Sequence, residues 1–377
     1  MGPDGSPYRT AWVPLADLAA RRDAWAALAA GAIVPNVFYA PAFALAATPL
    51  HGRGVGAIVI RDAEDRLVGL FPMRLSRTRW GVPLPLMVGW THPFAPLGTP
   101  LLDPGDPAGV VGAAVDHLAR AHPGVPLLLP CCPADGPVAA ALDAAIARRG
   151  GRQAAFGVHA RAELRSPSGP DAPPAILDPR AKEHARQRRR LAERGAPTFD
   201  LARGPAAREA LADFFALEAQ GWKGRAGTAA ASRPAELAMM TEAVTGLAET
   251  PGAGALVARL RLDGRPIAAG VVLTSGRAAW FWKTAYDETL AKFSPGVLLT
   301  LDLSAALLRE PDIDVVDSCA VENHPMIDRL WPGRRALSDR LIGQSTGPGF
   351  ALACRLETLR RRLITTARQA RDRLRGR

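Results

Sequence analysis

The spacing of apolar and polar residues predicts a mixed α/β fold for the first half of the chain. Stretches with an apolar residue at every third or fourth position indicate amphipathic helices, and short apolar runs bounded by turn residues indicate buried strands. The stretch at 83–98 is apolar but has no regular period, so we expect it to be irregular. Helices are expected at 15–30, 41–47, 108–121 and 138–149, and strands at 55–61, 67–75, 125–130 and 153–164.

The second half of the chain repeats this order of elements. Asp263-Gly264 is a favoured two-residue turn and predicts a hairpin between two strands. Helices are expected at 181–193, 205–220, 234–249, 295–309 and 325–330, and strands at 198–201, 256–262, 266–275, 278–286, 313–319 and 335–342. A basic amphipathic helix at 352–374 ends the chain.

Internal repetition predicts two copies of one fold packed together. Gly56-Ala-Ile-Val-Ile aligns with Gly254-Ala-Leu-Val-Ala, and each sequence begins a strand pair that is followed by more strand, a helix, a strand, a helix and a strand. A segment rich in Pro, Gly and Ser at 166–174 marks a boundary between them. We therefore expect an N-terminal domain at 1–165, a linker at 166–180, a C-terminal domain at 181–345 and a C-terminal helix at 346–377.

The charge composition singles out the lysines. The 377 residues carry a net charge of +11, and only four of the 47 basic side chains are lysine. Arginine does not replace lysine where a compact ammonium that can lose its proton is needed. Lys182, Lys223, Lys283 and Lys292 are therefore candidates for functional positions.

The cysteines and the apolar segments point to the cytoplasm. The four cysteines have neither the spacing of a disulfide framework nor that of metal ligands, and no His, Cys or Asp cluster suits a metal. The N-terminus lacks the basic and apolar regions of a signal peptide. The longest uncharged stretch, at 80–102, is interrupted by prolines and glycines, which is unlike a membrane-spanning helix.

Three motifs in the second half resemble one enzyme family. They are Glu218-x-x-x-Trp-Lys-Gly-Arg-x-Gly-Thr228, Trp282-Lys-x-x-Tyr286 and Ser294-Pro-Gly296 at the start of a helix, and Asp317 and Trp331 follow them. The chain resembles the CelD/BcsL-like acetyltransferases of the GNAT superfamily, which are related to the FemAB aminoacyltransferases. The resemblance implies tandem GNAT-like domains, each with a mixed, mainly antiparallel sheet flanked by helices.

The resemblance also implies a reaction, the transfer of an acyl group from acetyl-CoA or another acyl-CoA to an amine or hydroxyl acceptor. It favours a small molecule or a cell-envelope glycan precursor as the acceptor. GNAT enzymes usually grip the coenzyme A pyrophosphate with a glycine-rich turn, which the stretch at 292–296 replaces here. A helix N-terminus still offers free N–H groups to phosphate. Lys292, Ser294 and Gly296 are therefore the expected donor-binding residues.

Five residues are candidates for catalysis. Glu218 is expected to take a proton from the acceptor or to position it. Lys223 lies in a glycine-flanked loop suited to an anionic substrate or the donor phosphates, and Lys283 is expected to stabilise a developing oxyanion. Tyr286 is expected to give a proton to the leaving thiolate, and Asp317 to orient a basic side chain.

Trp222 and Arg225 in the same loop, and Tyr39 in the segment Asn36-Val-Phe-Tyr-x-Pro41, are expected to bind the substrate. Each candidate also has a structural alternative, such as a surface carboxylate for Glu218, core packing for Tyr286 or a strand-end cap for Asp317. Cys319 has no neighbouring His and Asp in sequence that would make it a nucleophile.

Two other functions remain open at this point. The FemAB relationship allows an aminoacyl-tRNA donor, and the fold could also serve as an inactive membrane-peripheral scaffold. The basic helices at 180–194 and 352–374 are candidates for an anionic membrane surface, which would place the cytoplasmic protein at the inner membrane. Neither helix has aromatic residues for base stacking, so we expect no specific nucleic acid partner.

Overall fold

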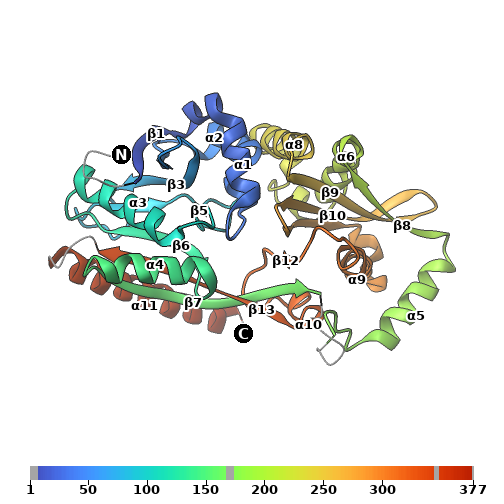
Figure 1. The fold of residues 1–377 in the computed structure, drawn as a ribbon. Helices are drawn as coiled ribbons and strands as arrows, with labels where there is room; N and C mark the ends of the chain where they lie inside the picture. Colours follow the sequence, from blue (N-terminus) through green and yellow to red (C-terminus); the bar gives the residue numbers. More distant parts are fainter. Residues whose placement is uncertain (1–6, 167–173, 344–347, 376–377) are drawn as a thin grey trace.

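The computed structural model describes residues 7–166, 174–343 and 348–375. Its first half alternates helices and strands in the order expected from the sequence (Figure 1). The elements are β1 (Arg9–Pro14), η1 (Leu15–Arg21), α1 (Arg22–Gly31), η2 (Val37–Tyr39), α2 (Pro41–His51), β2 (Gly56–Arg61), β3 (Leu67–Ser76), β4 (Leu86–Gly89), β5 (Leu101–Leu102), α3 (Pro107–Ala121), β6 (Leu127–Pro133), α4 (Gly136–Arg148) and β7 (Arg152–Arg165).

The second half begins with the basic helix and ends with the long C-terminal helix. Several helices begin at a proline, which has a fixed φ suited to the first helical position and needs no N–H partner there. The elements are α5 (Ala181–Ala192), β8 (Pro197–Arg203), α6 (Pro205–Gln220), α7 (Trp222–Arg225), η3 (Ala230–Ser232), α8 (Pro234–Ala248), β9 (Ala253–Leu262), β10 (Arg265–Ser275), β11 (Ala278–Tyr286), η4 (Glu288–Phe293), α9 (Pro295–Leu307), β12 (Val315–Asp317), α10 (Ile327–Leu330), β13 (Gly333–Gly343) and α11 (Pro348–Arg375).

One continuous sheet joins the two halves, and its strand order is symmetric. The order is β1-β2-β3-β4-β6-β13-β7-β12-β11-β10-β9-β8, with β5 paired to β3. From either end, four antiparallel strands are followed by a parallel pair, β4 with β6 and β11 with β12. This symmetry confirms the mixed α/β class with two copies of one mainly antiparallel arrangement.

The two halves exchange their last strands. β7 follows β6 in the chain but pairs with β12, whereas β13 follows β12 but pairs with β6. The exchanged strands pair with each other in an antiparallel ladder from Gly333–Glu163 to Gly343–Arg152. Figure 1 shows these long strands running from one half toward the other. The exchange ties the halves together by backbone hydrogen bonds as well as by side chains.

Helices cover both faces of the sheet. On one face, α1 and α2 of the first half and α6 and α8 of the second half share a single apolar core, where α2 packs against α8. Trp282 on β11 contacts the first half there, because its ring meets Phe43 edge-to-face and its Nε1 donates to the Phe94 carbonyl at 2.9 Å. On the other face, α3 and α4 cover one half and α9 and α10 the other, over separate cores.

Three strands were not expected from the sequence: β1, β4 and the two-residue β5. β4 lies inside the stretch at 83–98, where its four residues between prolines are too short a run to show a period. β1 is an edge strand with mostly exposed residues, and Trp12 on it is half-exposed, so it lacks the apolar alternation of a buried strand. The expectation of an irregular segment at 83–98 is therefore wrong at Leu86–Gly89.

Residues 167–173 of the predicted linker at 166–180 lie outside the described residues, and the domain boundaries stay predictions. Within the described part of the chain, no helix is long and apolar enough to cross a membrane.

Candidate active site

A pocket of about 440 Å³ lies in the second half, between the end of α6, α7, the end of β11 and the start of α9. It brings together residues from all three sequence motifs of this half. The predicted residues that line it are Glu218, Trp222, Lys223, Tyr286, Ser294 and Gly296. Its lining also includes Thr284, Glu288, His324 and Met326, which were not predicted.

One wall of the pocket is the free edge of β11. The parallel ladder between β11 and β12 has only three registered pairs, from Ala278–Val315 to Trp280–Asp317. Beyond Trp280, β11 continues to Tyr286 with β10 as its one ladder partner among the described strands. The strands therefore separate, and the edge of 281–286 offers backbone N–H and C=O groups to an extended ligand.

The loop after α6 folds back tightly and places Lys223 beside Glu218. Lys223 Nζ donates to Glu218 Oε1 at 2.7 Å, and the N–H of Ala230 donates to Glu218 Oε2 at 2.8 Å. A Cβ on Gly224 would lie 1.7 Å from the carbonyl oxygen of Ala219, so only glycine fits this turn. Glu218 is buried and therefore depends on these partners to hold its charge.

Glu288 on η4 anchors the same loop to the other side of the pocket. Its Oε1 accepts the Trp222 N–H at 2.8 Å, and its Oε2 accepts from Arg225 Nη2 at 2.6 Å. The hydrogen bond from Arg225, followed by that from the Trp222 N–H, lowers the pKa of Glu288. Trp222 is 60% exposed beside this anchor, so its ring lies at the pocket mouth.

The start of α9 forms the third side of the pocket. Ser294 has a φ of 52° in the left-handed region, and no side chain caps the helix there. The Tyr286 ring lies over Gly296, since a Cβ on Gly296 would be 3.2 Å from Tyr286 Cδ1. The uncapped helix end carries a partial positive charge that favours an anion. Lys292 is exposed nearby, with its amine 5.1 Å from the Phe293 ring centre.

Lys283 lies close to the pocket but is not part of its lining. Its Nζ is 4.7 Å from the centre of the Phe94 ring, which belongs to the first half, and 5.6 Å from that of Trp282. Burial, and then the positive charge of Lys223, lower the pKa of Lys283. The amine therefore loses its proton more readily than an exposed lysine does.

Three other predicted residues lie away from the pocket. Asp317 is buried where the strands are exchanged, and its Oδ2 accepts from Arg161 Nη2 at 2.6 Å and lies 3.6 Å from Arg335 Nη1. Tyr39 is 1% exposed in the shared core, where its hydroxyl donates to the Trp90 carbonyl. Arg225 binds Glu288 outside the lining. Asp317 thus orients two basic side chains, but not those of the pocket.

Two features concern catalysis by a cysteine nucleophile or by a metal ion. Burial raises the pKa of the Cys319 thiol, which disfavours the thiolate that a nucleophile requires. Among the described residues, no group of three or more His, Cys, Asp or Glu side chains is placed to hold a metal ion.

A comparison with protein families matches residues 180–323 to the acetyltransferase (GNAT) domain. This part of the chain is therefore similar to GNAT-type acetyltransferase domains. The pocket lies almost entirely within it, because only His324 and Met326 fall beyond the matched residues. The GNAT part of the expected resemblance is therefore confirmed, while its CelD-like branch stays a prediction.

Solved structures resemble the chain over most of its length. A crystal structure of FemX has 11% sequence identity and a TM-score of 0.56, and the match covers 85% of this chain and 95% of that chain. A conserved protein of unknown function from Bacteroides thetaiotaomicron has 10% identity and a TM-score of 0.52, covering 86% and 96%. At these identities the likeness shows the fold alone. A comparison with curated proteins finds no match.

Proposed function

We propose that the GNAT-type domain transfers an acyl group from an acyl-CoA thioester to an amine or hydroxyl acceptor. The observation that carries the proposal is one pocket bounded by the free edge of β11, the uncapped start of α9 and the Glu218–Lys223 pair. Each of these features suits a different part of the reaction. Cell-envelope glycan precursors, which the sequence resemblance favours, are the proposed acceptor class.

The donor side of the pocket suits a thioester with a phosphate group. The start of α9 offers its positive end to phosphate, and Gly296 leaves room for close approach beneath Tyr286. In this proposal, N–H groups on the edge of β11 that β12 does not cover donate to the thioester carbonyl as negative charge develops on its oxygen. Lys292, exposed near the mouth, adds a cation for the phosphates.

The acceptor side contains the groups that move protons. The acceptor nitrogen or oxygen attacks the carbonyl carbon, and the carbon–sulfur bond then breaks. In this proposal Glu218, oriented by Lys223, takes the proton that the acceptor loses. Tyr286 is the last residue of β11, and its ring lies beside Gly296 at the start of α9. In this proposal it gives its hydroxyl proton to the departing thiolate. Both residues return to their starting states by exchange with solvent.

Thermal unfolding with and without coenzyme A tests the donor. Coenzyme A at about 100 times its Kd is expected to stabilise the folded protein by about 2.7 kcal/mol and so to raise Tm. Lys223→Ala is expected to weaken this gain. Lys182→Ala removes the same charge on α5, outside the pocket, and is expected to keep it. No rise in Tm at millimolar coenzyme A would contradict the donor assignment.

A second candidate, an aminoacyl-tRNA donor, is favoured by the basic surface beside the pocket. Helix α5 packs against η4, and the side chains of Arg194 and Lys292 both lie near Phe293, at 5.5 and 5.1 Å from its ring centre. A polyanion bound there would lie next to Ser294 at the pocket. Native tRNA that co-purifies with the protein and dissociates steeply as salt rises would favour this donor over coenzyme A.

A further inference from the structure

Helix α11 is attached to the sheet by one face. Phe350 and Ala353 are buried against a small apolar core formed with Leu86, Leu128 and Leu341 of β4, β6 and β13. Figure 1 shows the helix lying along the outer side of β7 and β13. The burial of one face fixes which residues of the helix point to solvent.

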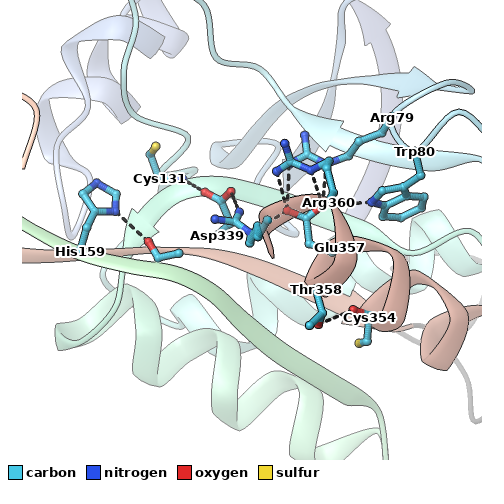
Figure 2. Close-up of polar contacts among 11 residues, drawn as sticks. Arg79, Trp80, Cys131, His159, Asp339, Cys354, Glu357, Thr358 and Arg360 are labelled. Atoms are coloured by element: carbon cyan, nitrogen blue, oxygen red, sulfur yellow. Dashed lines mark hydrogen bonds and ion pairs between the residues drawn. The ribbon is translucent and has the colours of Figure 1, made fainter. Parts of the chain in front are cut away.

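A buried carboxylate holds the helix in this rotation. Glu357 accepts hydrogen bonds from Arg79 and Trp80, which belong to the loop after β3, and from Arg360 and Arg361 one turn further along α11 (Figure 2). Burial alone would raise the pKa of Glu357, but the hydrogen bonds from Arg360 and Arg79 and the charges around it lower the pKa to about 2. The carboxylate therefore stays ionised and bound to the sheet side at neutral pH.

The opposite face of α11 carries a row of leucines. Leu352, Leu359 and Leu363 are 47%, 54% and 62% exposed, and Leu356 between them is partly buried. Spacings of four, three and four residues place these leucines along one stripe of a helix. We call Leu352, Leu356, Leu359 and Leu363 the outer leucine ridge. The core of the protein does not account for these side chains, because the inner face already anchors the helix.

Positive charge borders the outer leucine ridge. Arg355 and Arg362 are exposed beside it, and no ion pair to either is found in the described part of the chain. The sequence from 349 to 371 contains one acidic residue, Glu357, and it points inward. The exposed surface of this part of α11 is therefore apolar and cationic.

We propose that the outer leucine ridge and its arginines dock α11 on an anionic lipid bilayer. Leucines in a row enter the boundary between headgroups and acyl chains, while arginines beside them reach lipid phosphates. A second copy of the chain fits less well, because pairing two ridges would bring the exposed, positively charged Arg355 and Arg362 of both copies together. The ridge also has no aromatic ring on which a nucleic acid base could stack.

Sedimentation of the full chain with lipid vesicles tests the proposal. The protein is expected to bind vesicles made of equal parts phosphatidylcholine and phosphatidylglycerol, and to bind pure phosphatidylcholine vesicles far more weakly. Leu359→Ser with Leu363→Ser removes two exposed ridge leucines and is expected to weaken binding at least about tenfold. Arg355→Gln with Arg362→Gln is expected to weaken binding at low salt and to reduce its salt dependence.

Matched controls separate docking from folding. Leu50→Ser with Leu177→Ser makes the same chemical change at two partly exposed leucines away from α11, and is expected to leave vesicle binding unchanged. Because the ridge leucines are exposed, Tm is expected to stay the same in the ridge variant. Wild type that fails to bind anionic vesicles, equal binding by the ridge variant, or a vesicle-independent dimer that the ridge variant dissociates would overturn the proposal.

Discussion

The two halves of the chain differ at the N-terminus of the corresponding helix, which a carboxylate caps in the first half and no side chain caps in the second. In each half, one helix lies in the chain between the two strands of the parallel pair. This helix is α3, between β4 and β6, in the first half and α9, between β11 and β12, in the second. At α3, Asp106 caps the helix by accepting the Gly109 N–H at 2.9 Å, and Tyr8 donates to the same carboxyl group at 2.8 Å. At α9, Ser294 provides no side-chain cap. A carboxylate thus fills the anion position of the first half, whereas that of the second half is available.

The lysines show the same division. All four lysines lie in the second half, and Lys223 and Lys283 lie in or beside the pocket. The first half contributes the Phe94 ring to the surroundings of Lys283. We infer that one copy of the repeat binds the donor, while the other has become a support for it.

The largest expected effect is on turnover. Glu218→Gln keeps the shape of the side chain but removes its charge, and is expected to lower kcat at least about 100-fold because the acceptor's proton has no base. Thiol release from acetyl-CoA, with amine and hydroxyl acceptors present, measures the loss. Glu209→Gln, at an exposed position on the same helix α6, is expected to retain wild-type activity. Equal losses in both variants would remove Glu218 from the mechanism.

A smaller effect is expected where the loop turns back on α6. Gly224→Ala places a methyl group against the Ala219 carbonyl, so the loop with Trp222 and Lys223 must move. We expect at least about a tenfold loss of activity, which corresponds to about 1.4 kcal/mol of transition-state stabilisation. Gly31→Ala, where nothing lies within 4 Å of the added Cβ, is the control in the first half. Full activity of Gly224→Ala would show that the loop position is not required.

A stability effect is expected in the first half. Asp106→Ala removes the cap of α3 and is expected to lower the free energy of unfolding by about 1 kcal/mol. Chemical denaturation measures this change. Turnover of acetyl-CoA is expected to stay at the wild-type level, because α3 binds no donor in this account. If the folded Asp106→Ala protein turned over acetyl-CoA more slowly than folded wild type, the first half would also take part in the reaction.

The smallest expected effect concerns Lys283 and pH. The lowered pKa means that the folded chain holds this proton less tightly than the unfolded chain, so protonated Lys283 opposes folding. The penalty is complete below the lowered pKa and disappears as pH rises toward the usual value of 10.5. Lys283→Met is therefore expected to have a higher free energy of unfolding than wild type at neutral pH. The difference, followed by denaturation across pH, should shrink as pH approaches 10.5; a constant difference would contradict the assignment.

The sequence predicted the repeat and much of the pocket for local reasons. Gly224 and the residues around it form one turn, and Ser294 to Gly296 begin one helix, so short motifs contain the information. Glu288 was missed because its partner, the Trp222 N–H, is 66 residues away and nothing in the local pattern marks an anchoring carboxylate. His324 also lines the pocket without having been predicted, because a single histidine outside the three motifs carries no local signal.

The exchange of β7 and β13 also has no local sequence pattern. Which neighbour each strand joins is decided by contacts between the halves, which are far apart in the sequence. The same limit explains Asp317, which was expected at an active-site edge. It lies at a strand end as predicted, but the exchange places Arg161 of β7 and Arg335 of β13 around it.

Titration calorimetry of coenzyme A, with wild type and with variants at Ser294 and Asp106, tests the central claim most directly. Ser294→Asp gives α9 the acidic side chain that α3 has, at a left-handed position that Asp tolerates. Asp106→Ser removes the carboxylate charge from the start of α3 and keeps a hydroxyl that can cap the helix. The account predicts one binding site per wild-type chain, at least about tenfold weaker binding by Ser294→Asp because like charges repel, and unchanged binding by Asp106→Ser. Wild-type affinity in Ser294→Asp, or weakened binding in Asp106→Ser, would contradict it.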